Sequence, residues 1–229
     1  MTEHEVDLVN DLEFDDYRYA NYKILSFSDL FTSAIKISQD FKLGKGGILW
    51  DASYVMSRFL NTLDLQGKKV LELGSGTALP SILSALKGAE ADATDIFPAL
   101  SLTLANSELN QTNFTGKVNV AELDWTNSAH RHNIPHRSYD IIILSDVFYL
   151  PVSFKQDLAQ SFIETLLYFS SPHTQILMTY KYRISEILDP YLDLLKKNFE
   201  IQYFDDFVST FYHNPQVHLG ICTFPKLNN

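Results

Sequence analysis

The chain has 229 residues, of which 45% are apolar and 13% aromatic, and this composition fits one folded globular domain rather than a disordered protein. Its formal net charge of −10 argues against direct nucleic-acid binding, because a grip on phosphates needs clustered Lys and Arg. Cys222 is the only cysteine, which excludes an intrachain disulfide and a Cys-x-x-Cys metal pair.

The beginning of the chain is strongly acidic. Residues 1–16 carry seven acids and no Lys or Arg, which predicts an acidic flexible tail over residues 1–21. This segment lacks the basic and apolar parts of a secretory signal, and no run in the chain approaches the ~18 continuous apolar residues that span a bilayer. We therefore expect a cytoplasmic protein that has no membrane partner, and a monomer is the default expectation.

Two short alternating runs follow the tail. Residues 22–27 and 34–38 alternate apolar and polar side chains, which predicts a strand pair within an N-terminal strand extension over residues 22–43. Residues 44–229 would form the main domain. It opens with a glycine-rich turn and a helix over about residues 51–62, where apolar side chains recur at helical spacing.

From Lys68 onward, apolar strand patterns alternate with helix patterns. Strands are predicted over about residues 70–73, 91–96, 118–123, 139–144 and 175–179. Helices are predicted over about residues 79–86, 98–109, 158–167 and 187–199, and an antiparallel strand pair over about 200–208 and 217–224 ends the chain. This order predicts an α/β fold with a mostly parallel sheet, whose ligand would lie at the carboxyl ends of the strands.

A glycine turn follows the first predicted strand of the sheet. Gly74 and Gly76 flank Ser75, and glycine suits a sharp bend that lets a ligand approach the backbone. A dinucleotide-binding fingerprint would place a third glycine at position 79, where this chain has Leu79. The turn therefore indicates a nucleotide-type cofactor and weakens the case for NAD, although an ordinary tight turn would show the same glycine pair.

Further polar and aromatic residues fall at the same predicted edge. Asp95 ends the second strand, where a carboxylate can accept hydrogen bonds from both hydroxyls of a ribose or, alternatively, cap the helix at Pro98. Trp50 and Trp125 could stack on adenine or face a cationic sulfonium, although a lone Trp is often a core residue. Asp146 follows the fourth strand, where it would lie close to the cofactor or cap a turn.

A metal site has little support in the sequence. His130, His132 and His136 lie in one polar segment, but no carboxylate or cysteine partners accompany them. We interpret these histidines as surface residues and expect no metal.

Five short motifs occur in a familiar order. The chain resembles the seven-β-strand methyltransferases of family 16, the lysine methyltransferase-like group, from about residue 24 to its end. The resemblance rests on Gly47-Ile48-Leu49-Trp50-Asp51-Ala52, Glu72-Leu73-Gly74-Ser75-Gly76-Thr77, Thr94-Asp95, Asp124-Trp125 and Asp146-Val147-Phe148-Tyr149.

The resemblance implies a fold, a cofactor and a substrate class. The fold would be a Rossmann-like sheet of order 3-2-1-4-5-7-6 with an antiparallel seventh strand. The methyl donor would be S-adenosyl-L-methionine (SAM), and the acceptor a protein lysine; the chain is most similar to fungal members that modify translation elongation factor 1-alpha. The residues at donor-binding positions are Trp50, Gly74, Ser75, Gly76, Asp95, Trp125 and Ser145.

The acceptor motif of the family falls on Asp146 and Tyr149. The resemblance implies that Asp146 orients the lysine and accepts its proton directly or through water, and that Tyr149 lines the lysine channel. One position departs from the pattern, because many relatives carry glycine where this chain has Ala78. Since alanine tolerates ordinary helical angles, we expect Ala78 to shift donor affinity rather than abolish binding.

Three other functions stay open at this point. The chain could be a methyltransferase acting on a small molecule or on nucleic acid, although Val147 and Phe148 stand where many amino-methylating nucleic-acid enzymes have two prolines. An NAD-dependent oxidoreductase would have a similar turn, but Leu79 argues against it. The third alternative is a non-catalytic interaction module that keeps the fold.

Overall fold

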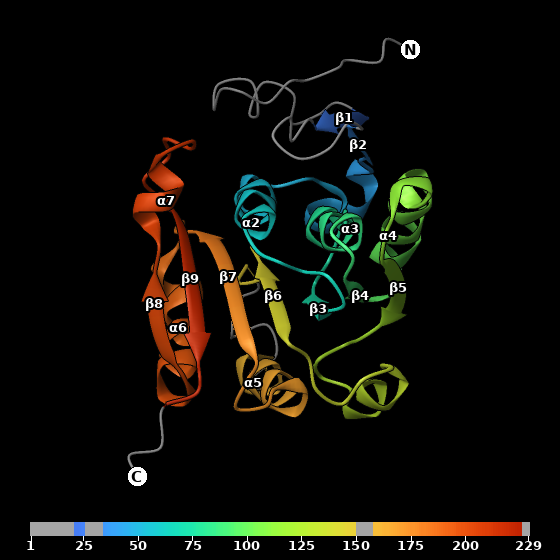
Figure 1. The fold of residues 1–229 in the computed structure, drawn as a ribbon. Helices are drawn as coiled ribbons and strands as arrows, with labels where there is room; N and C mark the ends of the chain where they lie inside the picture. Colours follow the sequence, from blue (N-terminus) through green and yellow to red (C-terminus); the bar gives the residue numbers. More distant parts are fainter. Residues whose placement is uncertain (1–20, 26–33, 150–157, 226–229) are drawn as a thin grey trace.

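The computed structural model describes residues 21–25, 34–149 and 158–225, and its architecture is the predicted α/β fold (Figure 1). The predicted acidic tail lies outside these residues except for its last position, Asn21. No helix in the described part of the chain is both long and apolar enough to cross a lipid bilayer.

A seven-stranded sheet forms the centre of the molecule. Its spatial order is β5-β4-β3-β6-β7-β9-β8, and β9 runs antiparallel to both of its neighbours. When the seven strands are numbered from β3 as strand 1 to β9 as strand 7, this is the order 3-2-1-4-5-7-6 that the resemblance implied, and it is confirmed. The strands are β3 (Lys69–Leu73), β4 (Glu90–Asp95), β5 (Lys117–Glu122), β6 (Ile141–Ser145), β7 (Gln175–Lys181), β8 (Glu200–Tyr203) and β9 (Val217–Thr223).

Helices cover both faces of this sheet. In Figure 1, α2, α3 and α4 lie on one side and α5 on the other. Ile141 and Ile143 of β6 pack into the core beneath α2 and α3, whereas Ile142 and Leu144 pack into the core beneath α5 and α6. The uninterrupted apolar run of β6 thus reflects burial on both faces. The helices are α2 (Asp51–Asn61), α3 (Leu79–Leu86), α4 (Phe97–Asn110), α5 (Leu158–Phe169), α6 (Ser185–Asn198) and α7 (Asp205–Ser209), with short 3-10 helices η1 (Phe41–Gly47), η2 (Gln111–Asn113) and η3 (Ser128–Asn133).

The predicted N-terminal strand pair is present as a separate two-stranded sheet. β1 (Tyr22–Leu25) and β2 (Ile35–Ser38) pair antiparallel. Asn106 on α4 accepts from the backbone N–H of Ser38 at 2.7 Å and donates to its carbonyl at 3.0 Å. Asn110, one turn later, bonds Lys36 in the same way. The two amides therefore attach the extension to the helix that follows β4.

Three local predictions were wrong. The strand predicted over residues 200–208 ends at Tyr203, and α7 replaces its second half. Asp205 and Asp206 in the first turn of α7 favour a helix start, and Phe207 packs on Phe59 with 5.5 Å between ring centroids. The glycine-rich turn forms η1, and the polar segment with His130 and His132, for which no helix was predicted, contains η3; both are short helices whose periodicity is too brief to recognise.

Candidate functional site

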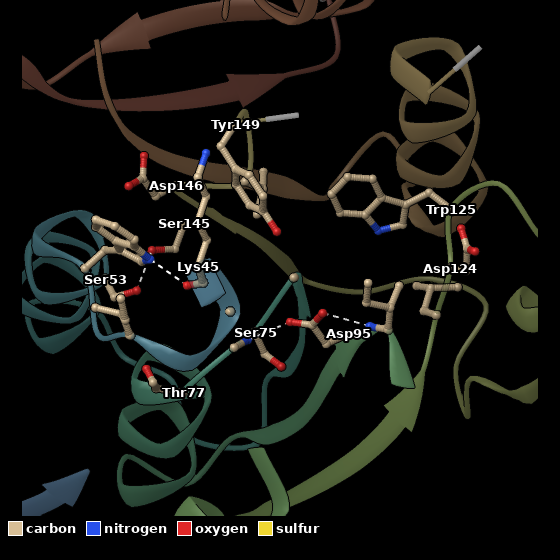
Figure 2. Close-up of a pocket in the computed structure, with 18 of the residues that line it drawn as sticks. Lys45, Ser53, Ser75, Thr77, Asp95, Asp124, Trp125, Ser145, Asp146 and Tyr149 are labelled. Atoms are coloured by element: carbon tan, nitrogen blue, oxygen red, sulfur yellow. Dashed lines mark hydrogen bonds between the residues drawn. The ribbon is translucent and has the colours of Figure 1, made fainter. Parts of the chain in front are cut away.

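A cavity of about 300 Å³ opens at the carboxyl edge of the parallel strands. The register places Leu73 beside both Thr94 and Leu144, so the residues that follow β3, β4 and β6 meet at this edge. All of the site residues predicted from the sequence line this cavity, namely Trp50, Gly74, Ser75, Gly76, Asp95, Trp125, Ser145, Asp146 and Tyr149 (Figure 2).

The glycine turn needs its glycines for both conformation and space. Gly74 and Gly76 have φ values of 71° and 49°, in the left-handed region. A Cβ on Gly74 would lie 3.0 Å from Val147 Cγ1, and one on Gly76 would lie 2.9 Å from the carbonyl oxygen of Gly46. The turn is therefore packed closely against two other walls of the cavity, and its backbone is exposed to whatever the cavity holds.

Ala78 corrects an expectation about this turn. Its φ is 63° and its ψ is 20°, so it is left-handed rather than helical. The reason given for tolerating alanine at this position was therefore wrong. A left-handed alanine costs on the order of 1 kcal/mol, which the buried position of its methyl group in the core beneath α3 offsets.

Glu72 supports the turn from below. Its side chain is buried, and Oε2 accepts from the backbone N–H of Ser81 at 3.1 Å and from the Ser81 hydroxyl at 2.5 Å. It thus caps the first turn of α3, which has no side-chain cap of its own. Burial raises the pKa of Glu72 to about 8, and the charge of Asp95 adds to that rise although the Ser81 hydrogen bonds oppose it.

Asp95 holds the end of β4 against the glycine turn. Oδ2 accepts from the backbone N–H of Gly76 at 2.8 Å and Oδ1 from that of Ile96 at 2.7 Å. Burial raises the pKa of this carboxyl, while the two backbone hydrogen bonds lower it. Each oxygen keeps a second lone pair, so the carboxylate can still accept from two ligand hydroxyls.

Both tryptophans line the cavity. Trp125 packs edge-on against Phe162, with ring centroids 5.1 Å apart, and Figure 2 shows it across the cavity from Asp146 and Tyr149. The indole N–H of Trp50 donates to the carbonyl of Lys45 at 2.8 Å. Both rings therefore contact the protein with one side and the cavity with another, which leaves an aromatic surface for a ligand.

Asp146 is bound by a residue that the sequence analysis missed. Arg183, two residues beyond β7, donates from Nη1 to Oδ1 and from Nη2 to Oδ2, both at 2.8 Å. Asp146 has φ 55°, so its backbone is also in the left-handed region. Burial lowers the pKa of Arg183, but the hydrogen bonds and charge of Asp146 raise it by more than burial lowers it. The guanidinium therefore stays charged. The pair fixes the carboxylate at the edge of the cavity.

A second buried carboxylate lies beside this pair. Asp51, at the start of α2, is 2% exposed and accepts from Lys181 Nζ at 3.0 Å and from the Tyr212 hydroxyl at 2.8 Å. Arg183 Nη2 lies 3.9 Å from its other oxygen. Burial raises the pKa of Asp51, but these hydrogen bonds and charges outweigh it and hold the pKa below its ordinary value. Asp51 therefore stays ionised.

Tyr149 extends into the cavity. Figure 2 shows its hydroxyl pointing into the space between Trp125 and Asp95. Burial and the carboxylates of Asp95 and Asp146 raise the pKa of this phenol, so it stays protonated and can donate a hydrogen bond. The Nζ of Lys45 lies 4.9 Å from the centroid of its ring. One face of the ring is thus in contact with a lysine side chain of this chain.

Several lining residues were not identified from the sequence. Ser53 is one of them, and its hydroxyl lies 3.0 Å from that of Ser145, which joins the first turn of α2 to the end of β6. Four others belong to the quoted motifs but were given no role, namely Ile48, Thr77, Asp124 and Val147. The rest lie outside the motifs, and closeness to them in the sequence was the only signal for most; they are Lys45, Gly46, Ile96, Leu123 and Leu158.

Among the described residues, no group of three or more His, Cys, Asp or Glu side chains could hold a metal ion. The cavity is lined by carboxylates, a phenol and the backbone of the glycine turn. A carboxylate beside a glycine turn suits a ribose, and aromatic walls suit an adenine ring or a sulfonium.

Known proteins match this chain in sequence and in fold. The family described as lysine methyltransferase matches residues 30–198. Protein N-lysine methyltransferase METTL21A of Danio rerio is 37% identical over 172 residues, which cover 73% of this chain and 75% of that protein. EEF1A lysine methyltransferase 3 of Mus musculus is 30% identical over 173 residues, which cover 73% of this chain and 71% of that protein.

A solved structure shows the same fold at low sequence identity. The putative methyltransferase SMU.776, complexed with SAH, has a TM-score of 0.57 and 18% identity, and the match covers 88% of this chain and 60% of that one. The cavity thus lies in a fold of the class I SAM-dependent methyltransferases, and the chain belongs to the lysine methyltransferase family.

Proposed function

We propose that this chain transfers a methyl group from SAM to the Nζ of a lysine in another protein. The observation that carries the proposal is the convergence of both predicted residue sets, for donor and for acceptor, on one cavity at the sheet edge. Family membership and the relatives named as protein-lysine methyltransferases support the same reaction.

The residues present fit the donor. The cavity volume of about 300 Å³ is at the lower end of the range for nucleoside-sized ligands, and it opens toward solvent for the rest of the molecule. Asp95 would accept from the ribose hydroxyls, and the Gly74-Ser75-Gly76 turn would bring its backbone close to the donor. Trp125 and Trp50 would contact the adenine and the sulfonium, and Ser145 would line the same site. When bound, SAM supplies an electrophilic methyl group.

The residues around the acceptor must hold the substrate lysine as a neutral, nucleophilic amine. An ordinary lysine pKa of about 10.4 means that neutralising the amine near pH 7 costs about 4–5 kcal/mol. Asp146 would orient the amine beside Tyr149, whose hydroxyl oxygen would accept from an amine N–H and leave the nitrogen lone pair free to attack. Because one positioned amine must attack along a single line, alignment by these two residues supplies much of the rate.

Translation elongation factor 1-alpha is the acceptor that we propose first. A relative named as an EEF1A lysine methyltransferase, 30% identical to this chain, supports that choice. The chain would act in the cytoplasm as a monomer, with residues 44–229 forming the methyltransferase domain. Fluorescence microscopy of a tagged chain and light scattering of the purified protein check the location and the oligomeric state.

Labelling of a proteome tests the proposed function. Lysate from a strain that lacks this gene would be incubated with labelled SAM and the purified chain, and labelled bands would be analysed by mass spectrometry. We expect methylated lysine in a discrete protein band, and elongation factor 1-alpha is the first candidate for that band. Label in nucleic acid or in small molecules, with none in protein, would reject the proposal in favour of another acceptor class.

A further inference from the structure

We propose that Arg183 keeps the acceptor lysine uncharged by balancing the charge of Asp146, so that Asp146 orients the amine without serving as its base. This inference rests on the proposed function, because it concerns a lysine placed beside Asp146. It assigns a positioning role to a residue outside the motifs of the chain, two positions after the end of β7.

Three hydrogen bonds occupy most of the acceptor sites of Asp146. Oδ1 accepts from Arg183 Nη1 at 2.8 Å and, more weakly, from the backbone N–H of Lys181 at 3.3 Å. Oδ2 accepts from Arg183 Nη2 at 2.8 Å. Since each carboxylate oxygen offers two lone pairs, one site on Oδ2 is left for the incoming amine. A bidentate guanidinium fork is a charge-assisted pair, so it fixes the orientation of the carboxylate toward that remaining site.

The local charges already balance before any lysine enters. Asp146 and Asp51 contribute two negative charges, and Arg183 and Lys181 contribute two positive charges. Each cation is hydrogen-bonded to one of the carboxylates, and the Arg183 guanidinium also lies 3.9 Å from Asp51. The cluster is neutral as a whole, and Asp51 is buried beneath it. A lysine ammonium beside Asp146 would therefore add an uncompensated positive charge, whereas a neutral amine would not.

Two further charges near Tyr149 offset each other, because the Asp95 carboxylate acts on this phenol and Lys45 brings one cation. Tyr212 donates its hydroxyl to Asp51, and Tyr149 stays protonated, so neither adds a negative charge. Lys45 adds a further cation, 4.9 Å from the Tyr149 ring centroid. The Arg183 guanidinium also lies 5.4 Å from the Trp50 ring, which holds it on this side of the cavity. Together these groups add no net negative charge, so the lysine would lose its proton to water rather than to a carboxylate.

The pH dependence of kcat tests this inference through two substitutions of opposite charge. Arg183→Gln removes a positive charge, so we expect the apparent pKa that governs kcat to rise by about one unit, which lowers kcat about tenfold at a fixed pH below it. Asp146→Asn removes a negative charge, and its residual activity should show a lower apparent pKa than wild type. Arg183→Lys keeps the charge and loses the fork, so its apparent pKa should stay near that of wild type while kcat falls.

Controls separate this role from a structural one. Arg137→Gln makes the same change in net charge at a residue that stacks on Tyr168, and it should leave the pH profile unchanged. SAM affinity, measured by calorimetry, should be equal in wild type and Arg183→Gln. If Arg183→Gln does not fold, the downward shift in Asp146→Asn still decides the question.

Parallel pH profiles in all variants, or shifts of the same sign for Arg183→Gln and Asp146→Asn, would overturn the inference while leaving the proposed function intact. If the wild-type chain methylates no protein lysine, the proposed function fails and the inference falls with it.

Discussion

The carboxylate of Asp95 accepts a hydrogen bond from the backbone N–H of Gly76 at 2.8 Å, which joins the ends of two neighbouring parallel strands. The predicted ribose-binding acid and the predicted glycine turn therefore form one unit. A change in either residue should disturb the other, and the two effects can be measured separately as donor affinity and as stability.

Asp95→Ala should weaken SAM binding strongly. The substitution removes the proposed acceptor of the ribose hydroxyls and the partner of Gly76 N–H, and hydrogen bonds to charged groups contribute about 1.5–3 kcal/mol each. We therefore expect at least a tenfold rise in Kd, measured by titration calorimetry. Asp95→Asn keeps one oxygen acceptor and should fall between wild type and Asp95→Ala. Unchanged affinity in Asp95→Ala would place the ribose contact elsewhere.

Asp146→Ala should retain SAM binding and lose most methyl transfer. The carboxylate is fixed by Arg183 at the edge of the cavity, on the side away from Trp125, where the amine and not the donor would meet it. Calorimetry and a radiolabel transfer assay on the same preparation check both halves. Asp193→Ala, at an exposed position of α6, serves as a control that should change neither quantity. Full transfer by Asp146→Ala would refute the assignment of this residue.

Gly76→Ala should reduce both stability and donor affinity. The new methyl group would meet the carbonyl oxygen of Gly46 at 2.9 Å, and φ at this position is 49°. Gly67→Ala is a matched control, because Gly67 has φ 69° but nothing within 4 Å of the added Cβ. We expect Gly67→Ala to cost about 1 kcal/mol of unfolding free energy through backbone strain alone, and Gly76→Ala to cost more.

Urea unfolding and calorimetry on both glycine variants make this comparison. Equal stability losses, with SAM affinity intact in Gly76→Ala, would contradict the close packing of the turn against the segment that contains Gly46.

Glu72 should make the stability of the chain depend on pH. Its pKa is raised by burial to about 8 in the folded chain, above the ordinary value of 4.5. Between these values the folded chain holds a proton that the unfolded chain has released, so the unfolding free energy falls as pH rises, by up to about 1.4 kcal/mol per unit. Glu72→Gln cannot titrate and should lose this dependence.

Urea unfolding of wild type and Glu72→Gln from about pH 5 to about pH 8 tests this expectation. The unfolding free energy of Glu72→Gln minus that of wild type should increase steadily with pH. A constant difference between the two chains across the range would show that the carboxyl titrates at its ordinary value.

The sequence predicted the sheet and the floor of the site because both follow from local pattern. Apolar runs marked the strands, and parallel strands share one carboxyl edge, so Gly74, Asp95 and Asp146 had to meet there. The left-handed conformation of Ala78 was missed, because nothing in alanine itself favours it. The glycine that many relatives carry at this position was the available signal.

The cluster of charged side chains around Asp146 and Arg183 could not be predicted from the sequence for a different reason. Asp51, Asp146 and Arg183 come from three distant segments, and charged residues just past a strand usually indicate a solvated edge. β7 extends to Lys181 instead of the predicted Thr179, and its last residues pair antiparallel with β9. This extension places Arg183 beside the end of β6. Long-range pairing of this kind depends on tertiary geometry that no short pattern in the sequence encodes.

Tandem mass spectrometry of the reaction product tests the central claim most directly. The purified chain would be incubated with elongation factor 1-alpha and SAM that carries a deuterated methyl group, with Asp146→Ala in parallel. We predict a deuterated methyl group on the Nζ of a lysine in the wild-type reaction and a strongly reduced amount with the variant. No deuterium on any lysine, either of this acceptor or of the proteins in a lysate, would contradict a protein-lysine methyltransferase.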